Sequence, residues 1–285
     1  MGVRRILVAE EAGACYGVER ALALAEKASS EATGPVHTLG PLIHNPRVVA
    51  DLEAAGVTVV RTPSEAAGAT LILRTHGVTP EVEREAREKC AKVIDATCPF
   101  VKKVHVAVER LSREGYQVVV VGEAGHPEVE ATLGHAPGAV VVSTGAPAPA
   151  HQARGKLGVV VQTTQPRALL AEVVDALIET ADELRVFDTI CEATSGHQSA
   201  CADLARRADV MVVIGGRNSA NTTHLAEIAA AGCARTHHVE SSDELDPSWF
   251  VGAETVGITA GASTPASQIE AVRTAIAGIL GENVS

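Results

Sequence analysis

Aromatic residues are scarce in this chain. Phe, Trp and Tyr make up 2% of its 285 residues, whereas 46% of the residues are hydrophobic. The core must therefore be aliphatic, and the length allows one large domain or several small ones. The formal net charge of −11 disfavours a nucleic-acid partner, because phosphate contacts need Lys and Arg. The sequence has no signal-peptide pattern and no apolar run of about 18 residues, so we expect a cytoplasmic protein without a membrane partner.

The six cysteines include no CxxC pair, so neither a zinc ribbon nor a thioredoxin-type motif is indicated. In a cytoplasmic protein they are not expected to form a disulfide framework. Cys15, Cys98 and Cys191 share one context, because each follows a strand-like run and precedes a helix-like segment. These segments are CYGVERALALAEKA, CPFVKKVHVAVERL and CEATSGHQSACADLA. Of the other three, we expect Cys90 and Cys201 in helices and Cys233 in a turn.

The same order of segments recurs after each of these cysteines. An apolar strand-like run leads to the polar loops IHNP, GHPE and NSAN, and a second run leads to RTHG, QTTQ and TAGAST. By their separation from the cysteines, His44, His126 and Ser219 correspond, as do His76, Thr163 and Thr259. The pattern predicts three βαβ-type units, with residues 14–97, 98–190, and 191–281 together with 1–13. The strand before Cys15 belongs by this pattern beside the third unit.

The alternation of strands and helices predicts an α/β fold with mainly parallel sheets in three pseudo-symmetric units. Ligands of such sheets bind at the carboxyl ends of the strands. Units around a pseudo-threefold axis would direct all three cysteines to one centre. A lone cysteine is more often a packed core residue, but three in one context predict a shared metal centre. Structural zinc needs four protein ligands and an iron–sulfur cube usually has four cysteines, so three thiols leave one position open for a substrate.

The loops at this centre carry groups that suit a small anion, above all a phosphate or diphosphate. His44, His76 and His126 contribute ring N–H donors, and the other loops contribute hydroxyls, amides and backbone N–H groups. Glu128 is the candidate acid near a metal-bound oxygen, although a first-turn residue stabilised by the helix dipole is the alternative. Asp95 and Asp188 are expected to be strand-end or capping groups. We expect no role beyond packing or capping for His37, His105, His135, His151, His224, His237 and His238.

Nine ordered motifs resemble one enzyme family. They are GACYGVERA, GPLIHNP, RTHGV, DATCPFVKKVH, GEAGHPEVEAT, QTTQ, ICEATSGHQ, GGRNSANTTHL and TAGASTP. Together, from about Val3 to Ile279, they are similar to the 4-hydroxy-3-methylbut-2-enyl diphosphate reductase family, also called IspH or LytB.

The resemblance implies one 4Fe–4S cluster per chain, held by Cys15, Cys98 and Cys191. The allylic diphosphate substrate would bind through its hydroxyl at the open iron. Its diphosphate would contact His44, His76, His126, Ser219, Asn221 and Ser263. Glu128, Thr163 and His126 would be the catalytic set, with Thr163 and Glu128 helping to deliver a proton. The reaction is the reductive loss of water, and the electrons would come from ferredoxin or flavodoxin.

The sequence departs from the family pattern at several positions. Ala220 stands where a second serine is usual, and His197 stands where an arginine is usual. Ala131 replaces a usual glycine and Ala14 a usual phenylalanine. Because Ala220 removes a hydroxyl from the expected diphosphate site, we expect weaker substrate binding with the chemistry retained.

Four alternatives remain open from the residues. A 4Fe–4S dehydratase similar to quinolinate synthase would need no external electrons. A non-catalytic iron–sulfur redox sensor would need the cysteines but not Glu128. A zinc hydrolase would be colourless, and a purely structural triplicated domain would hold no metal.

Overall fold

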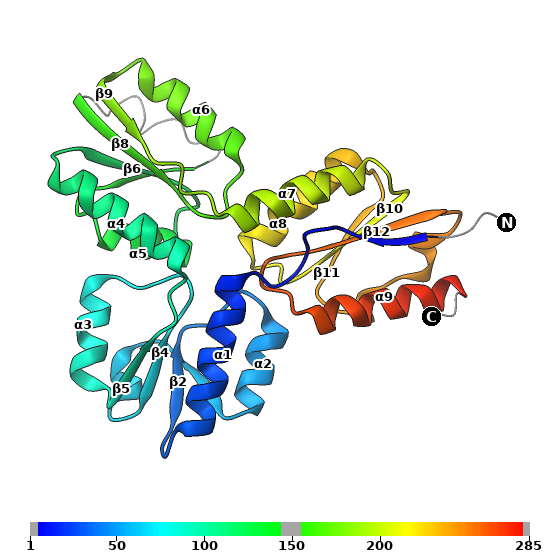
Figure 1. Cartoon of the computed structure of the whole chain (residues 1–285), viewed down its shortest axis with the longest axis horizontal. Coiled ribbons are helices and arrows are strands. Elements are labelled where there is room, and N and C mark those ends of the chain that lie inside the picture. Colours follow the sequence, from blue (N-terminus) through cyan, green and yellow to red (C-terminus); the bar gives the residue numbers. More distant parts are fainter. Residues whose placement is uncertain (1–4, 144–154, 282–285) are drawn as a thin grey trace. The chain divides into compact units, whose positions relative to one another are not determined.

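The computed structural model describes residues 5–143 and 155–281. Its strands form three four-stranded sheets, and within the described residues every strand pairing is parallel. The strand orders are β3-β2-β4-β5, β7-β6-β8-β9 and β11-β10-β12-β1. We call these the first, second and third sheets. The three orders are equivalent, so the predicted α/β fold with repeated parallel sheets is confirmed (Figure 1).

The elements follow one another in the predicted alternation. The first repeat, which forms the first sheet, contains α1 (Tyr16–Glu31), β2 (Val36–Leu39), α2 (Pro46–Ala54), β3 (Val57–Val60), β4 (Thr70–Leu73), α3 (Pro80–Lys89) and β5 (Lys92–Asp95). The second contains α4 (Pro99–Arg113), β6 (Gln117–Val121), α5 (Pro127–Gly134), β7 (Val140–Val142), β8 (Gly155–Val161), α6 (Arg167–Ile178) and β9 (Ala181–Val186). The third contains α7 (Glu192–Ala205), β10 (Val210–Ile214), α8 (Ala220–Gly232), β11 (Thr236–Val239), β12 (Thr255–Ala260), α9 (Ala266–Leu280) and β1 (Arg5–Val8).

The first strand of the chain completes the last sheet. β1 pairs with β12, with Arg5 opposite Thr255 and Val8 opposite Ile258. This confirms the expectation that the strand before Cys15 packs beside the third unit. In each sheet, the edge strand next to the cysteine segment is therefore the strand that immediately precedes that cysteine.

The chain divides into two compact units. One, the third-sheet unit, contains Met1–Tyr16, His44–Pro46 and Glu192–Ser285. The other, the two-sheet unit, contains Gly17–Ile43 and Arg47–Cys191. The expected boundaries of three units stay a prediction, while the three sheets themselves are observed.

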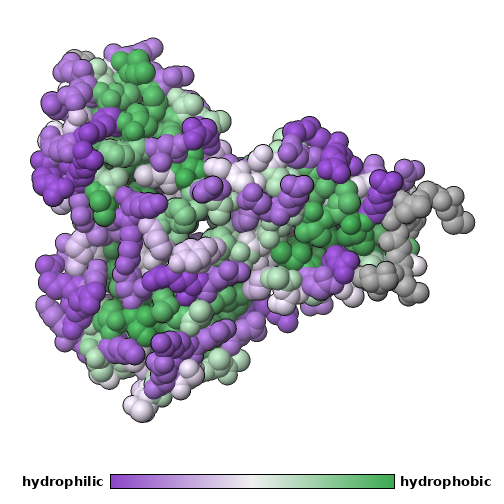
Figure 2. All heavy atoms as spheres, in the orientation of Figure 1, coloured by the Kyte–Doolittle hydropathy of each residue, from purple (hydrophilic) through white to green (hydrophobic). Residues whose placement is uncertain are grey.

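The strands form aliphatic cores because alternate side chains face opposite sides of a sheet. In β6, Val118 and Val120 belong to the cluster that contains Leu111 of α4, whereas Val119 and Val121 belong to the cluster that contains Leu170 of α6. β10 shows the same division between the helix layers of the third sheet. Figure 2 shows hydrophobic residues along the strands and hydrophilic residues over the helices. Across residues 5–143 and 155–281, no helix is long and apolar enough to cross a membrane.

Candidate active site

Three backbone hydrogen bonds place the repeated cysteines in equivalent positions. The N–H groups of Cys15, Cys98 and Cys191 donate to the carbonyl oxygens of Ala262, Thr75 and Thr163, at 3.1, 2.9 and 3.0 Å. Each acceptor lies two residues beyond the end of a central strand of its sheet, after β12, β4 and β8 respectively. The cysteines are thus fixed at the carboxyl ends of the strands, where the parallel-sheet rule places ligands.

Two aspartates shape the turns before the second and third of these cysteines. Asp95 Oδ1 accepts a hydrogen bond from the N–H of Thr97 at 2.9 Å, and Asp188 Oδ1 accepts one from the N–H of Ile190 at 3.2 Å. Asp95 is the last residue of β5 and Asp188 lies two residues beyond β9, so the strand-end alternative is confirmed for Asp95.

The other cysteines differ from the repeated three. Burial raises the pKa of Cys201, inside α7, to about 11, and its thiol contacts the carbonyl oxygen of Leu225. Cys90 was expected inside a helix but is the residue that caps the C-terminus of α3, and Cys233 caps α8. All six cysteines lie in the described part of the chain, and none of them forms a disulfide there.

Glu128 and Thr163 form a buried, doubly hydrogen-bonded pair in the two-sheet unit. Glu128 lies in the first turn of α5 and is 2% exposed. Its Oε1 accepts the N–H of Thr163 at 2.7 Å, and its Oε2 is hydrogen-bonded to Thr163 Oγ1 at 2.8 Å. Burial raises the pKa of Glu128 to about 7, against the lowering effect of both Thr163 contacts. The carboxyl group can therefore hold or release a proton near neutral pH.

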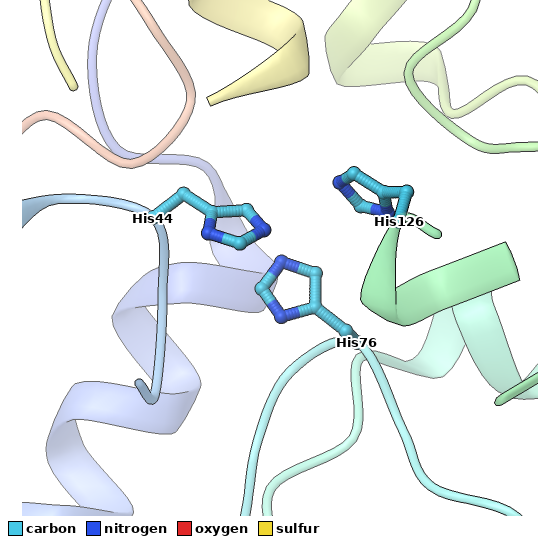
Figure 3. Close-up of side chains that lie close together, drawn as sticks. All are labelled: His44, His76 and His126. Carbon is cyan, nitrogen blue, oxygen red and sulfur yellow. The ribbon is translucent and has the colours of Figure 1, made fainter. Parts of the chain in front are cut away.

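His126 caps the helix that carries Glu128. Its Nδ1 accepts the N–H of Glu128 at 3.1 Å, so this nitrogen presents its lone pair to the backbone and a neutral ring carries its proton on Nε2. His76, on the loop after β4, lies edge-on to His126, with ring centroids 5.5 Å apart (Figure 3). Figure 3 also labels His44, which lies in the His44–Pro46 segment of the third-sheet unit.

Three other predicted site residues lie in the third-sheet unit. Ser263 Oγ donates to the carbonyl oxygen of His44 at 3.1 Å, which holds the 44–46 loop against the loop after β12. Ser219 caps α8, and its Oγ accepts the N–H of Thr222 at 3.3 Å. Asn221, in the first turn of α8, is 3% exposed.

The amide of Asn221 is buried without a hydrogen bond. Neither its Oδ1 nor its Nδ2 has a partner among the described residues. Leaving such a group unsatisfied costs about 1–3 kcal/mol, so a buried amide of this kind marks a place where a ligand can bind. Thr222, the next residue, presents its hydroxyl to the backbone of Gly261, where an added Cβ would lie 2.0 Å from Oγ1.

The structure corrects one correspondence expected from the spacing. We expected Thr163 to correspond to His76 and to Thr259, but the hydrogen bonds to the cysteines place Thr163 in register with Thr75 and Ala262. Thr259 lies inside β12 and is fully buried. The offset differs because the loops before the second central strand have different lengths in the three repeats.

The positions that depart from the family pattern are also described. His197 is 5% exposed on α7; burial lowers its pKa, and its Nδ1 has no partner within the described residues. Ala220, the first residue of α8, is 8% exposed beside Ser219. Ala131 packs inside α5. The weaker substrate binding expected from Ala220 stays a prediction.

The remaining histidines differ in their surroundings. His105 stacks on His135 at 4.0 Å, and burial lowers the pKa of His105 to about 4. His237 stacks on Trp249 at 3.9 Å, and His238 contacts the carbonyl oxygen of Gly215. His151 lies outside the described residues.

Three parallel sheets of one strand order, with a cysteine at the same strand end in each, define an α/β protein with a triplicated thiol site. Residues 6–277 match the family described as LytB protein, and the chain belongs to this family. It is 48% identical to the 4-hydroxy-3-methylbut-2-enyl diphosphate reductase of Geotalea daltonii, over 92% of this chain and 93% of that protein. It is 46% identical to the enzyme of the same name from Aquifex aeolicus, over 95% of each chain.

Solved structures agree with this assignment. One, of (E)-4-hydroxy-3-methyl-but-2-enyl diphosphate reductase, described as the terminal enzyme of the non-mevalonate pathway, is 45% identical with a TM-score of 0.71 and covers 98% of this chain and 100% of its own. The E-1-hydroxy-2-methyl-but-2-enyl-4-diphosphate reductase from Plasmodium falciparum is 25% identical, with a TM-score of 0.90, and the match covers 96% of this chain and 88% of that one.

Proposed function

We propose that this chain reduces 4-hydroxy-3-methylbut-2-enyl diphosphate to isopentenyl diphosphate and dimethylallyl diphosphate, the last step of the non-mevalonate isoprenoid pathway. Membership of the LytB family and relatives of that name over nearly the whole chain support the reaction. The structural observation that carries it is the position of Thr163. This residue accepts the N–H of Cys191 and holds both oxygens of the buried acid Glu128.

The donor set fits a 4Fe–4S cluster bound by Cys15, Cys98 and Cys191. Three thiols with one backbone environment supply three of the four ligands such a cluster usually has, which leaves one iron for the substrate. When bound, the cluster supplies the two electrons singly and a Lewis-acidic site for the allylic hydroxyl.

Side chains of this protein would supply and transfer a proton. The allylic C–O bond breaks, two electrons and two protons are consumed, and the oxygen leaves as water. Glu128 is placed to supply a proton, because its raised pKa keeps a large share of the carboxyl protonated near pH 7. Thr163 Oγ1, which is bonded to Glu128, would pass that proton toward the hydroxyl of the substrate.

We further assign the diphosphate to the polar groups at the helix starts and loops. Asn221 offers an amide donor that no described residue uses, and Ser219 lies at the N-terminus of α8, where the helix dipole favours an anion. Ser263 and the histidines would supply further donors. The set is His44, His76, His126, Ser219, Asn221 and Ser263.

The electron donor would be a small carrier protein such as ferredoxin or flavodoxin. A cytoplasmic location, and the lack of nucleic-acid and membrane partners, stay predictions.

The test is an iron and sulfide count on protein purified without oxygen, followed by turnover of the substrate with a chemical reductant. We expect about four irons and four sulfides per chain and reductant-dependent turnover. Turnover of a different substrate without reductant would favour a dehydratase. Bound zinc without sulfide would favour a hydrolase, and a cluster with no turnover would favour a sensor.

The Cys98→Ser variant sharpens this test. It removes a proposed cluster ligand, so we expect loss of iron and sulfide and of all measurable turnover. The matched control is Cys90→Ser. Cys90 is a half-buried cysteine of the same unit, and it caps the C-terminus of α3. Full cluster content and turnover in Cys98→Ser would contradict the ligand assignment.

A further inference from the structure

The two-sheet unit contains a cavity separate from the residues assigned above. Its volume is about 290 Å³, and it lies between the ends of β2 and β4, the start of α3, and α5. The wall is apolar, formed by Leu39, Val78, Val82 and Ala131, whereas Arg61 and Arg74 bring two guanidinium groups to it.

Arg74 is the unusual group in this cavity. It is half-buried, and burial lowers its pKa without an acidic group to oppose the effect. Within the described residues, the only hydrogen bond of its guanidinium runs from Nε to the carbonyl oxygen of Gly77, at 3.3 Å, and the guanidinium forms no ion pair there. By contrast, Arg110 and Arg185 in the same unit both pair with Glu114. Removing a guanidinium from water favours a carboxylate or phosphate partner, so this half-buried group could bind an anion in the cavity.

The backbone leaves room for this charge. Gly40 adopts a φ of +69°, and a Cβ there would lie 2.8 Å from Arg74 Nη1, so a side chain at this position would displace the guanidinium. The absence of a side chain at Gly40 leaves the space that the head group of Arg74 occupies.

The other charged groups leave the cavity positive. Arg61 is exposed and forms no ion pair within the described residues. The pKa of Glu65 is lowered chiefly by the hydrogen bond that its carboxylate accepts from the backbone N–H of Arg61, and the charge of Arg61 contributes least. Glu130 also lines the cavity, and its Oε1 accepts the N–H of Gly125 at 3.2 Å. Two cations and one carboxylate therefore line the cavity, which leaves the lining with an excess of one positive charge.

We propose that this cavity binds a small organic phosphate with a short apolar group. A guanidinium can bind phosphate oxygens through two parallel N–H donors, and the aliphatic wall suits the apolar group. The volume is at the lower end of the range of ligand pockets, which limits the ligand to a small metabolite. This inference is independent of the proposed reaction.

The ligand would contact two segments that also carry candidate site residues. Val78 and Thr79 follow His76 on one loop, and Ala131 lies on the helix that begins after His126. The phosphate site is nevertheless distinct, because none of the residues assigned to the cluster or the diphosphate lines the cavity.

The test is calorimetric titration of the cluster-loaded, full-length protein with 3-methylbutyl phosphate, inorganic phosphate and 3-methylbutanol. We expect the phosphate ester to bind most tightly, because only this probe satisfies both parts of the cavity. Arg74→Gln should weaken its binding about tenfold or more, the usual loss for a charged hydrogen bond. Arg61→Gln, at an exposed position, should weaken binding about threefold, since an exposed charge contributes less.

Controls keep the result decisive. Arg84→Gln changes an exposed arginine of α3 outside the cavity and should leave the affinity unchanged. If Arg74→Gln does not fold, the exposed Arg61→Gln variant still tests the site. The same titration in Ser219→Ala should show unchanged affinity. Loss of binding in Ser219→Ala, with both cavity variants unaffected, would place the ligand at α8 and overturn the proposal, as would no binding of the phosphate ester.

Discussion

Glu128 and Asn221 occupy the same position in two repeats, yet their surroundings are opposite. Each is the second residue after the N-cap of the helix that follows the first central strand, with His126 and Ser219 as the caps. Both are buried, at 2% and 3% exposure. Both oxygens of Glu128 are hydrogen-bonded to Thr163, whereas neither amide atom of Asn221 has a partner among the described residues.

One substitution accounts for the hydroxyl bond that is missing in the third sheet. The residue that corresponds to Thr163 in the third sheet is Ala262, because their carbonyl oxygens accept the N–H groups of Cys191 and Cys15. Ala262 has no hydroxyl to offer Asn221. The second sheet therefore holds an internally bonded acid, and the third holds an amide with its bonding capacity available to a ligand. Repeats of one fold can thus acquire different roles in a site by changing a single facing side chain.

The largest effect is expected from Glu128→Gln. The amide preserves the shape of the side chain but cannot deliver a proton, so turnover should fall about 10²- to 10⁴-fold. Iron and sulfide content should stay unchanged, because Glu128 is not a proposed ligand. Glu172→Gln, an exposed change on α6, is the control, and its turnover should equal that of the parent. Normal turnover in Glu128→Gln would remove the proton-delivery role.

Asn221→Ala should affect substrate binding more than stability. Loss of an amide bond to a charged diphosphate should weaken substrate affinity about tenfold to a hundredfold. The free energy of unfolding without substrate should change little or rise, because an unsatisfied buried amide is removed. Ser219→Ala provides the contrast, since losing this helix cap should lower the unfolding free energy by about 1 kcal/mol. A strong loss of stability in Asn221→Ala, with unchanged affinity, would show that the amide is structural.

Much of this comparison could be predicted from the sequence, and part could not. The repeated strand–cysteine–helix order predicted the three sheets, the pairing of β1, and Glu128 as the acid, because period-two and helical patterns are local properties. The edge strands β3, β7 and β11 were not individually predicted, since runs of three or four residues carry too little pattern. The correspondence of Thr163 with Ala262 was missed because loop lengths shift the spacing, and only the hydrogen bonds to the cysteines reveal it.

Thr163→Val tests the partner of the acid. Its two hydrogen bonds lower the pKa of Glu128, so loss of the hydroxyl should raise that pKa further above about 7. Turnover that needs protonated Glu128 should then persist to higher pH, although its maximum should fall about tenfold if Oγ1 passes the proton. The measurement is turnover against pH, and Thr163→Ser, which keeps a hydroxyl, should restore the parental profile.

The raised pKa of Glu128 should also make the stability of the protein depend on pH. Below the ordinary pKa of 4.5, Glu128 is protonated in both the folded and unfolded states. As pH rises from 4.5 to about 7, only the unfolded state ionises, so stability falls over this window. In Thr163→Val the loss should continue to higher pH. A pH profile unchanged in both turnover and unfolding would contradict the assigned pKa of Glu128.

The smallest effect, and the most direct test of the comparison, is expected from Ala262→Thr. A threonine at this half-buried position would reproduce in the third sheet the hydroxyl that Thr163 supplies in the second. A bond to Asn221 should raise the unfolding free energy by about 1 kcal/mol and weaken substrate affinity about fivefold, since the amide then has an internal partner. Ala262→Val adds similar volume without a hydroxyl and separates bonding from crowding. If the threonine and valine variants behave alike, the missing hydroxyl does not explain why Asn221 is unpaired. If only the threonine variant gains stability and loses substrate affinity, the amide of Asn221 binds the ligand because no hydroxyl of the third sheet occupies it.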